Sequence, residues 1–365
     1  MDYRTIVDAK RKMDFNLTEH ETLVKLVDDA QKKGTNAQKE MVRLGNNAAK
    51  LLSPIQKLPF LLGDSDLKGV GPKTKCAVGI DGSFQTVGGI GGIWYAPISV
   101  AMIVFPNGAQ SKAQVRIFSA GIEQIKEQEE HNPNRAASII MLSGETKAIE
   151  YWAVNGTPAY VLIDGPIVDP PGYPEEGYVK DRCNAIRKCL RTNYMVGCVK
   201  RSRDNFFIEY LKHQKGIGAA TIQDFPSDQH LMLFLFTAFR RSGHSGPIFT
   251  KWMNVSDDQA YKAYSKHGIH VVSLYFQKST NSQALRLDIP FAKNPADNET
   301  ERAVLHIVRT ASDWTYPGHD YPLPIFLAHQ KCNIREGCAE VLYDEILTRT
   351  TTSDPSSQTV QMLLR

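Results

Sequence analysis

Long apolar segments are missing from this sequence. A helix that crosses a bilayer needs about 18 or more consecutive apolar residues. The most apolar runs, residues 98–105 and 231–239, are much shorter than that. The first residues also lack the apolar stretch that is typical of a secretory signal. We therefore expect a cytoplasmic protein that is not embedded in a membrane.

Closely paired cysteines are missing as well. None of the six cysteines forms a CxxC pair or another zinc-binding spacing; they are Cys76, Cys183, Cys189, Cys198, Cys332 and Cys338. In a cytoplasmic protein such isolated cysteines are expected to be reduced and buried. The spacing argues against a structural zinc site.

A strong charge of one sign is also absent, because the formal net charge is only +4 over 365 residues. Positive charge is nevertheless concentrated in residues 180–203, where eight basic residues accompany a single acidic one, Asp181. A segment of this kind attracts phosphate groups. A DNA contact is therefore one interpretation, and a solvated helix face followed by a basic loop is the other.

With 42% hydrophobic residues, the chain is able to bury a substantial core. A helical arm is expected over residues 1–60, as one helix that starts at Thr18-x-x-Glu21 and runs to Gly34 and a second over residues 36–52 that Pro54 ends. One α/β domain is expected over residues 75–345, and a polar tail over residues 350–365.

Apolar runs and helical periodicities alternate within that domain. The pattern predicts strands over residues 76–80, 93–105, 114–120, 159–163, 195–199, 231–239, 271–276 and 285–289. It predicts helices over residues 139–155, 179–191 and 298–310, and another that opens at residues 321–329. The expected fold is a mixed sheet flanked by helices.

A repeated motif joins an apolar strand to an aspartate and a glycine, as GIDGS at residues 79–83 and LIDGP at residues 162–166. If the two strands are neighbours, Asp81 and Asp164 meet at one edge of the sheet. Two carboxylates at that separation require a cation between them. The alternative is that each Asp-Gly pair is only a turn.

The helix between these strands carries two candidate acidic ligands, Glu145 and Glu150. Glu145 lies on the apolar stripe of the helix together with Leu142, Ala148, Ile149 and Trp152. We favour Glu145 on this ground. Three carboxylates at one site suit a hard ion such as Mn²⁺ or Mg²⁺, which assists phosphodiester hydrolysis.

Two further residues are candidates with clear alternatives. His329 follows an apolar run, where a histidine is either a metal ligand or a residue of the core. Lys200 ends an apolar strand and begins the run Lys-Arg-Ser-Arg, so it either contacts the scissile phosphate or is an ordinary charge at a strand end.

The order of these motifs resembles that of the NurA nucleases, the partners of the HerA hexameric DNA translocase. The motifs are GIDGSF (79–84), the glutamate-bearing helix, VLIDGPI (161–167), VGCVKRS (196–202), LRLDIP (285–290) and YPLPIFLAHQ (321–330). The resemblance implies a ribonuclease H-like fold, a homodimer with a central channel, and Mn²⁺-dependent cleavage of DNA in end resection or repair. The implied activities are a 5′-to-3′ exonuclease and a single-strand endonuclease.

Matched motif by motif, the resemblance implies Asp81, Asp164, His329 and a glutamate of the helix as metal ligands, with Lys200 as a further catalytic residue. The Pro-rich residues 169–174 and the polar residues 240–265 depart from the family pattern. Two other functions remain open. One is another ribonuclease H-like nuclease, of the resolvase or guide-dependent type, and the other is a non-catalytic adaptor that binds DNA ends.

Overall fold

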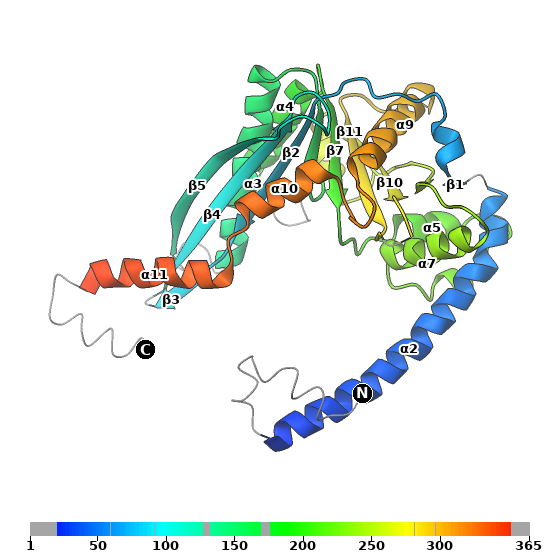
Figure 1. The fold of residues 1–365 in the computed structure, drawn as a ribbon, viewed down its shortest axis with the longest axis horizontal. Helices are drawn as coiled ribbons and strands as arrows, with labels where there is room; N and C mark the ends of the chain where they lie inside the picture. Colours follow the sequence, from blue (N-terminus) through cyan, green and yellow to red (C-terminus); the bar gives the residue numbers. More distant parts are fainter. Residues whose placement is uncertain are drawn as a thin grey trace.

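The computed structural model describes residues 20–351 except 59, 91, 127–131, 169–175, 281 and 296. Its centre is a mixed sheet of eleven strands (Figure 1). The strands are β1 (Leu61–Leu62), β2 (Ala77–Phe84), β3 (Val87–Ile90), β4 (Ile93–Phe105), β5 (Gln114–Lys126), β6 (Tyr160–Asp164), β7 (Tyr194–Val199), β8 (Ile248–Thr250), β9 (Met253–Asn254), β10 (His270–Gln277) and β11 (Leu285–Phe291).

The strands are connected by helices of very different length. The longer ones are α2 (His20–Gln56), α3 (Pro133–Asn155), α4 (Glu176–Cys189), α7 (Asp228–Arg241), α9 (Asp297–Trp314), α10 (Leu323–Cys332) and α11 (Glu336–Thr351). The shorter ones are η2 (Asp64–Leu67), α5 (Phe206–Lys212), α6 (Ala219–Ile222) and α8 (Lys262–Lys266).

Five strands form the part of the sheet that matters for function, in the spatial order β5-β4-β2-β6-β7. The first three in sequence, β2, β4 and β5, pair antiparallel. The next two, β6 and β7, run parallel to β2. The parallel connections require crossovers, which α3 and α4 provide. This arrangement confirms the expected mixed sheet flanked by helices.

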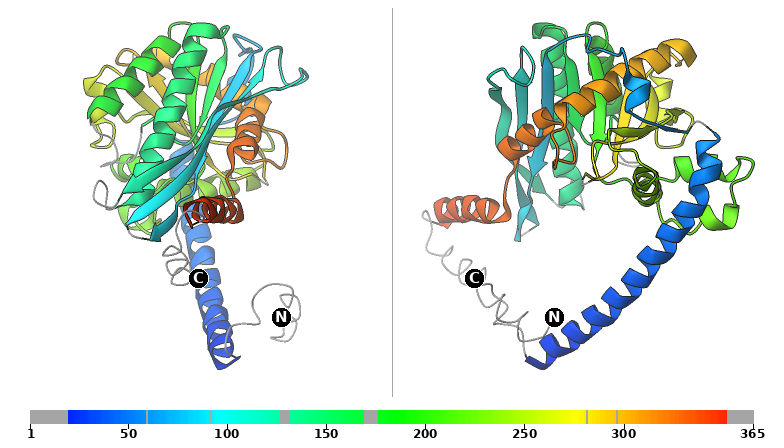
Figure 2. Two further views of the ribbon diagram at one scale, coloured as in Figure 1. Left: turned by 90° about the vertical axis from the view of Figure 1, so that its left-hand side faces the viewer. Right: turned by 45° about the vertical axis from the view of Figure 1, so that its right-hand side comes forward.

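The two faces of the sheet bury different helices (Figure 2). Alternate residues of a strand point to opposite faces, so Val78 and Ile80 of β2 pack on the side of α3 and α4. Ala77 lies on the side of α9 and α10. The same alternation places Asp81 on the α10 side and makes β6 present Tyr160 and Leu162 to that side. The central strands β2 and β6 are therefore buried on both faces.

The N-terminal part of the described chain is a single helix, which corrects the expectation of two. Helix α2 continues through Gly34 and contains Pro54 close to its end. Gly34 is exposed, and a glycine inside a helix costs only about 1 kcal/mol relative to alanine, which the surrounding turns offset. Leu44, Ala48 and Leu51 pack against α7, while the first half of α2 projects away from the sheet (Figures 1 and 2).

The prediction of a strand over residues 231–239 is wrong, because this segment belongs to helix α7. Ser227 begins the helix by accepting a hydrogen bond from the backbone N–H of His230. Leu231, Leu235 and Phe239 repeat every four residues and are buried, which is a helical period. The unbroken apolar run concealed that period.

Other differences concern the ends of elements. Strand β5 extends to Lys126, beyond the strand predicted over residues 114–120, and β3 is a short strand that was not predicted. Helix α11 was not predicted. Most of the expected polar tail, from residue 352 onward, lies outside the described residues. The domain boundaries at residues 60, 75 and 345 stay predictions.

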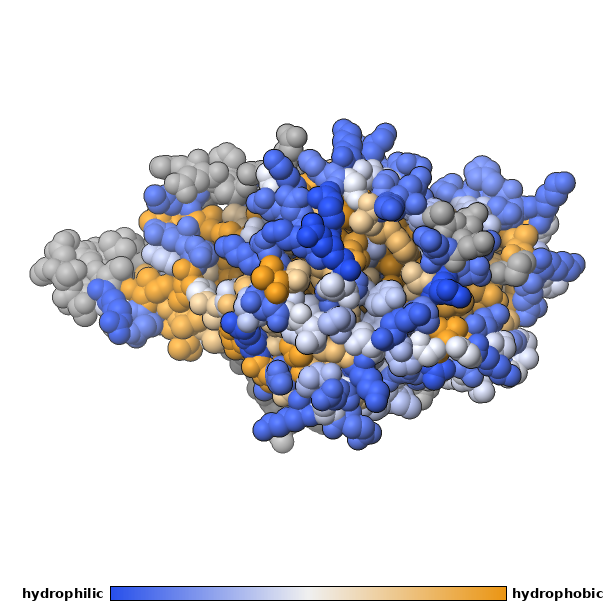
Figure 3. Space-filling model, turned by 90° about the horizontal axis from the view of Figure 1, so that it is seen from above, coloured by the Kyte–Doolittle hydropathy of each residue, from blue (hydrophilic) through white to orange (hydrophobic). Residues whose placement is uncertain are grey.

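The surface is mostly hydrophilic when the molecule is seen from above (Figure 3). Apolar residues gather toward the left-hand end of this view, and the exposed apolar side chains include Val115, Ile117 and Ile122 of β5. Among the described residues, no helix combines the length and the apolar character that a membrane span requires. None of the six cysteines, all of which the structure describes, forms a disulfide; five are buried and Cys338 is exposed.

Candidate active site

Two aspartates stand side by side at one edge of the sheet. Strands β2 and β6 are parallel neighbours, and their pairing ends with Ile80 opposite Ile163. Asp81 and Asp164 are the next residues of the two strands, so the same register brings them together. Asp81 is 5% exposed and the side chain of Asp164 is 11% exposed. The carboxylates therefore meet in a poorly hydrated place.

Helix α10 brings a histidine to the same carboxylates. Nδ1 of His329 lies 2.8 Å from Oδ2 of Asp81 and 3.8 Å from Oδ2 of Asp164. The helix can approach so closely because β2 has a glycine beneath it. A Cβ on Gly79 would lie 2.3 Å from the backbone carbonyl of Pro324, in the first turn of α10. Gly79 thus sets the distance between strand and helix.

Asp81, Asp164 and His329 form a group with the dimensions of a metal site. Each offers one ligand atom, and these atoms lie within 4.8 Å of one another. Carboxylate oxygens are the usual ligands of Mg²⁺ and Mn²⁺, and an imidazole suits a transition metal. The three side chains fit a divalent cation, and Mn²⁺ matches the mixture of oxygen and nitrogen ligands better than Mg²⁺ does.

The carboxyl group of Asp81 is strongly perturbed. Burial, together with the nearby Asp164 carboxylate, raises its pKa to about 6, although the hydrogen bond with His329 opposes this change. Cys332, one turn beyond His329 on α10, also contacts Asp81, at 3.4 Å from Sγ to Oδ2. A group that resists ionisation in this way is stabilised as a carboxylate by a nearby cation.

A lysine lies beside Asp164. Lys200 follows β7, and its ammonium group is paired with Oδ2 of Asp164. The same Nζ lies 4.0 Å from the centre of the Tyr321 ring, a cation–π contact. Beside these groups is a cavity of about 530 Å³, whose lining includes Asp164, Lys200, Arg201, Asp320, Tyr321 and His329. Asp164 and the two basic residues Lys200 and Arg201 therefore face the same cavity.

Glu145 lies on the other face of the sheet and is not part of the three-residue group. It is 2% exposed, and its Oε2 lies 3.7 Å from Nη1 of the buried Arg182. It lies against β2 on the face opposite Asp81, since a Cβ on Gly82 would lie 3.1 Å from its Oε1. Glu150 is on the surface and forms an ion pair with Lys188. Of the two candidates, Glu145 is the one beside β2.

The basic segment of residues 180–203 is not a uniform cationic surface, because some of its basic side chains are buried or already paired. Arg182 is buried, and Arg187 donates to the side chain of Asn184 and the backbone carbonyl of His267. Lys188 is already paired with Glu150. The exposed basic residues of the segment are Lys180, Lys188, Arg191, Arg201 and Arg203.

Sequence reasoning missed three residues around the site: Tyr321, Cys332 and Gln229. Cys332 follows His329 by three residues, so helical periodicity could have placed both on one face of α10. Tyr321 stands just before the helix, within the motif that contains His329. Gln229 could not have been found, because its helix α7 was not predicted and residues 231–239 were expected to form a strand.

Three antiparallel strands followed by two parallel ones, with Asp81 within the first and Asp164 at the carboxyl end of the fourth, define a ribonuclease H-like α/β protein with an acidic site that fits a metal ion. Residues 77–334 match the NurA domain family. The chain therefore belongs to the NurA family, in agreement with the resemblance seen in its motifs.

Solved structures include similar folds. The NurA nuclease from Sulfolobus solfataricus is 14% identical, with 93% of this chain and 100% of that chain covered and a TM-score of 0.51. Another NurA structure is 13% identical over 75% of this chain and 89% of that chain (TM-score 0.35). Endonuclease V from Ciona intestinalis, in complex with inosine-containing DNA, is 14% identical over 83% and 96% (TM-score 0.33). No curated protein sequence gives a significant match.

Proposed function

We propose that the protein is a metal-dependent DNA nuclease that hydrolyses phosphodiester bonds. The observation that carries this proposal is the convergence of Asp81, Asp164 and His329 within 4.8 Å at the sheet edge of a NurA-family fold. The proposed activities are a 5′-to-3′ exonuclease and a single-strand endonuclease. The proposed cofactor is Mn²⁺, or Mg²⁺ in its place.

Asp81, Asp164 and His329 would hold the cation. A divalent ion in such a site lowers the pKa of water to supply a nucleophile and stabilises the charge that develops on the phosphate oxygens. The low exposure of the two aspartates strengthens these electrostatic interactions, because little water screens them. His329 is more exposed, at 45% of its side chain, so its free ring nitrogen can accept or release a proton at the edge of the site.

Lys200 and Arg201 would contact the phosphate from the cavity side. The ammonium group of Lys200 is held between Asp164 and the Tyr321 ring, where it can offset negative charge on a phosphate oxygen. Glu145 is proposed as a supporting acidic residue beside Gly82 of β2, and its pairing with Arg182 of α4 favours a role in holding α3 against α4.

The proposed partners are DNA, a second copy of the chain in a homodimer, and a HerA-type hexameric ATPase, with DNA end resection or repair as the biological setting. Family membership supports these partners. The exposed residues Lys180, Arg201 and Arg203 can contact phosphate groups. Lys180 lies after β6 in the chain, and Arg201 and Arg203 lie after β7.

The nuclease proposal is tested by an assay on single-stranded DNA labelled at either the 5′ or the 3′ end, with and without Mn²⁺. Cleavage that requires the metal supports the reaction class, and the pattern of products from the two labels reports the polarity. A protein that is inactive with and without the HerA-type partner contradicts the proposal. Including branched and RNA-paired substrates tests the resolvase-type and guide-dependent alternatives.

A DNA-end adaptor without catalysis is the second candidate, since it needs only the exposed basic residues. Its carboxylates would be structural and would bind no metal. Isothermal titration of Mn²⁺ into the wild type and into Asp81→Asn separates the two functions. A nuclease requires a binding isotherm that the substitution weakens, whereas an adaptor requires the same heat from both proteins.

A further inference from the structure

We infer that Gln229 is a positioning residue that holds Lys200 toward the phosphate in the reaction proposed above. This inference rests on the proposed function, and it concerns a residue of helix α7 that does not line the cavity. It follows from how the chain is supported after the end of β7.

The sheet stops supporting the backbone just before Lys200. Strand β7 pairs with β6 as far as Cys198 and with β11 as far as Val199. Lys200 and Arg201 follow as a bend, with both side chains at the cavity. A residue at this point needs a partner for its backbone if its side chain is to keep one direction.

Gln229 supplies that partner. Its Nε2 donates to the backbone carbonyl of Lys200 at 2.7 Å, and its Oε1 accepts from the backbone N–H of Ser202 at 2.8 Å. These two backbone groups are the ones that a neighbouring strand would engage, because residues i and i+2 of an extended chain face the same side. A carboxamide is suited to this task, since it offers a donor and an acceptor together.

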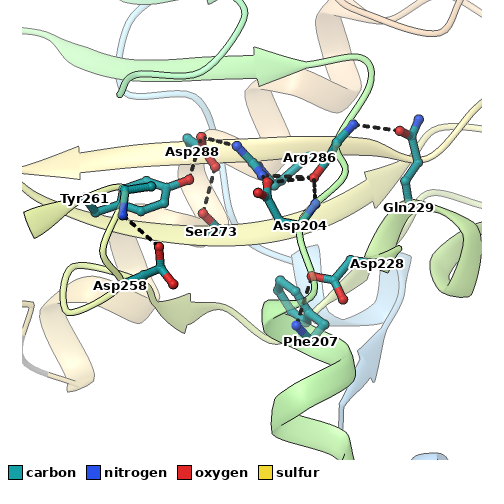
Figure 4. A network of polar contacts seen from close by, with 11 residues as sticks. Asp204, Phe207, Asp228, Gln229, Asp258, Tyr261, Ser273, Arg286 and Asp288 are labelled. Atoms are coloured by element: carbon teal, nitrogen blue, oxygen red, sulfur yellow. Dashed lines mark hydrogen bonds and ion pairs between the residues drawn. The ribbon is translucent and has the colours of Figure 1, made fainter. Parts of the chain in front are cut away.

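A second set of contacts holds the segment after Lys200 (Figure 4). Arg286 of β11 donates from Nη1 to Oγ of Ser202 at 3.0 Å, is paired with Asp204, and donates from Nη2 to Asp288 at 2.9 Å. The backbone N–H of Asp228 donates to the carbonyl of Asp204 at 2.8 Å. Helix α7 is therefore fixed to this segment at two places, and Gln229 has a stable base.

The side chain and the backbone of Lys200 are therefore held by different residues. Asp164 and Tyr321 contact the ammonium group, whereas Gln229 contacts only the backbone of the same residue. The position of the Lys200 backbone decides whether the ammonium group reaches a phosphate. A misplacement of about 1 Å in a catalytic group costs about a hundredfold in rate, so a backbone clamp has a large effect without touching substrate.

The test replaces Gln229 by methionine, which keeps the length of the side chain and removes both hydrogen bonds. Gln223→Ala is the control, an exposed glutamine at the end of α6. We expect Gln229→Met to lower kcat by about tenfold to a hundredfold with a small change in KM. In a Lys200→Ala background the same substitution should change kcat less than about twofold, because coupled residues are not additive.

A second measurement does not depend on nuclease activity. The rate at which an acylating reagent modifies Lys200, followed by peptide mass spectrometry, should rise severalfold in Gln229→Met and stay unchanged in Gln223→Ala. Equal Lys200 labelling in the wild type and Gln229→Met, or equal losses of kcat in both backgrounds, would overturn the inference. An inactive wild type with altered labelling would instead contradict the nuclease proposal. If Gln229→Met does not fold, Gln229→Glu, which keeps the acceptor for Ser202 and loses the donor for Lys200, is measured in the same two ways.

Discussion

Asp81 and His329 are 248 residues apart in the chain, and Nδ1 of His329 lies 2.8 Å from Oδ2 of Asp81. One side chain comes from the second strand of the sheet and the other from a helix near the end of the described chain. Their contact depends on the close packing of α10 on β2.

Enlarging Gly79 should disturb the contact between Asp81 and His329. A Cβ at this position would meet the backbone of Pro324 at 2.3 Å, and backbone cannot move aside cheaply. We expect Gly79→Ala to lower the free energy of unfolding by about 1–3 kcal/mol and to weaken Mn²⁺ binding. Chemical denaturation and metal titration measure the two effects. Gly121→Ala in β5, where a Cβ meets nothing within 4 Å, should change neither.

Neutralising either aspartate of the three-residue group should abolish turnover. The metal-held charge contributes several kcal/mol to the transition state, so Asp81→Asn and Asp164→Asn should each lose at least about 100-fold in kcat. Circular dichroism should show an unchanged fold. Asp257→Asn, at an exposed position, is the matched control. If Asp81→Asn digested single-stranded DNA at the rate of the wild type, this site would be excluded.

The two glutamates of α3 should behave differently. Glu145→Gln leaves the buried Arg182 with a weaker partner, and breaking a buried ion pair costs about 3–5 kcal/mol. Glu150→Gln removes an exposed pair with Lys188, which contributes about 0–1 kcal/mol. Urea denaturation of the two variants measures the difference. Equal stability losses would show that the Glu145–Arg182 pair does not hold α3 in place.

Stability should depend on pH through Asp228. This buried carboxylate accepts hydrogen bonds from the backbone N–H groups of Phe207 and Ile208, yet burial raises its pKa to about 7 from 3.8. The folded state therefore binds a proton that the unfolded state has released, and stability from this group is lost as pH rises from about 4 to about 7. The loss is on the order of a few kcal/mol.

Denaturation of the wild type and of Asp228→Asn at pH 5 and pH 8 measures this effect. The wild type should lose more stability than the variant over that interval, because asparagine does not ionise. Asp258→Asn serves as the exposed control, which should retain the pH dependence of the wild type. Parallel pH profiles for the wild type and Asp228→Asn would contradict the prediction.

Arg201 should contribute to DNA affinity in a salt-dependent way. It is exposed at the mouth of the cavity that contains Lys200, so it can replace a counterion on the phosphate backbone. Arg201→Gln should reduce the slope of log K against log salt by about 0.7 for single-stranded DNA. Fluorescence anisotropy at several salt concentrations gives the slope. Arg241→Gln, exposed at the end of α7, should leave the slope unchanged.

The position of the aspartate pair could be predicted from the sequence because two local patterns agreed. Each apolar run was followed by Asp-Gly and a helical period preceded the second, which is compatible with parallel neighbours in one sheet, and β2 and β6 are such neighbours. The contact between His329 and Asp81 could not be predicted in this way, because no local pattern shows that α10 crosses β2. That crossing depends on Gly79, and a glycine in a strand has several possible causes.

The errors have physical reasons too. An unbroken apolar run is compatible with a buried strand or a buried helix, and residues 231–239 proved to be helical. Composition alone could not show which basic residues of the segment 180–203 are available to phosphate, because the partners of Arg182 and Lys188 lie far away in the sequence, on α3. Asp81 and Glu145 lie on opposite faces of the sheet because alternate residues of β2 point to opposite faces. A count of helical turns along α3 does not reveal this.

The dependence of the three-residue group on α10 also bears on the order of synthesis. Asp81 and Asp164 are made early, and His329 is added only when nearly the whole described chain has been synthesised. An N-terminal fragment that stops before residue 329 has the two acids without their imidazole. The proposed metal site is thus complete only after all eleven strands of the sheet have been translated.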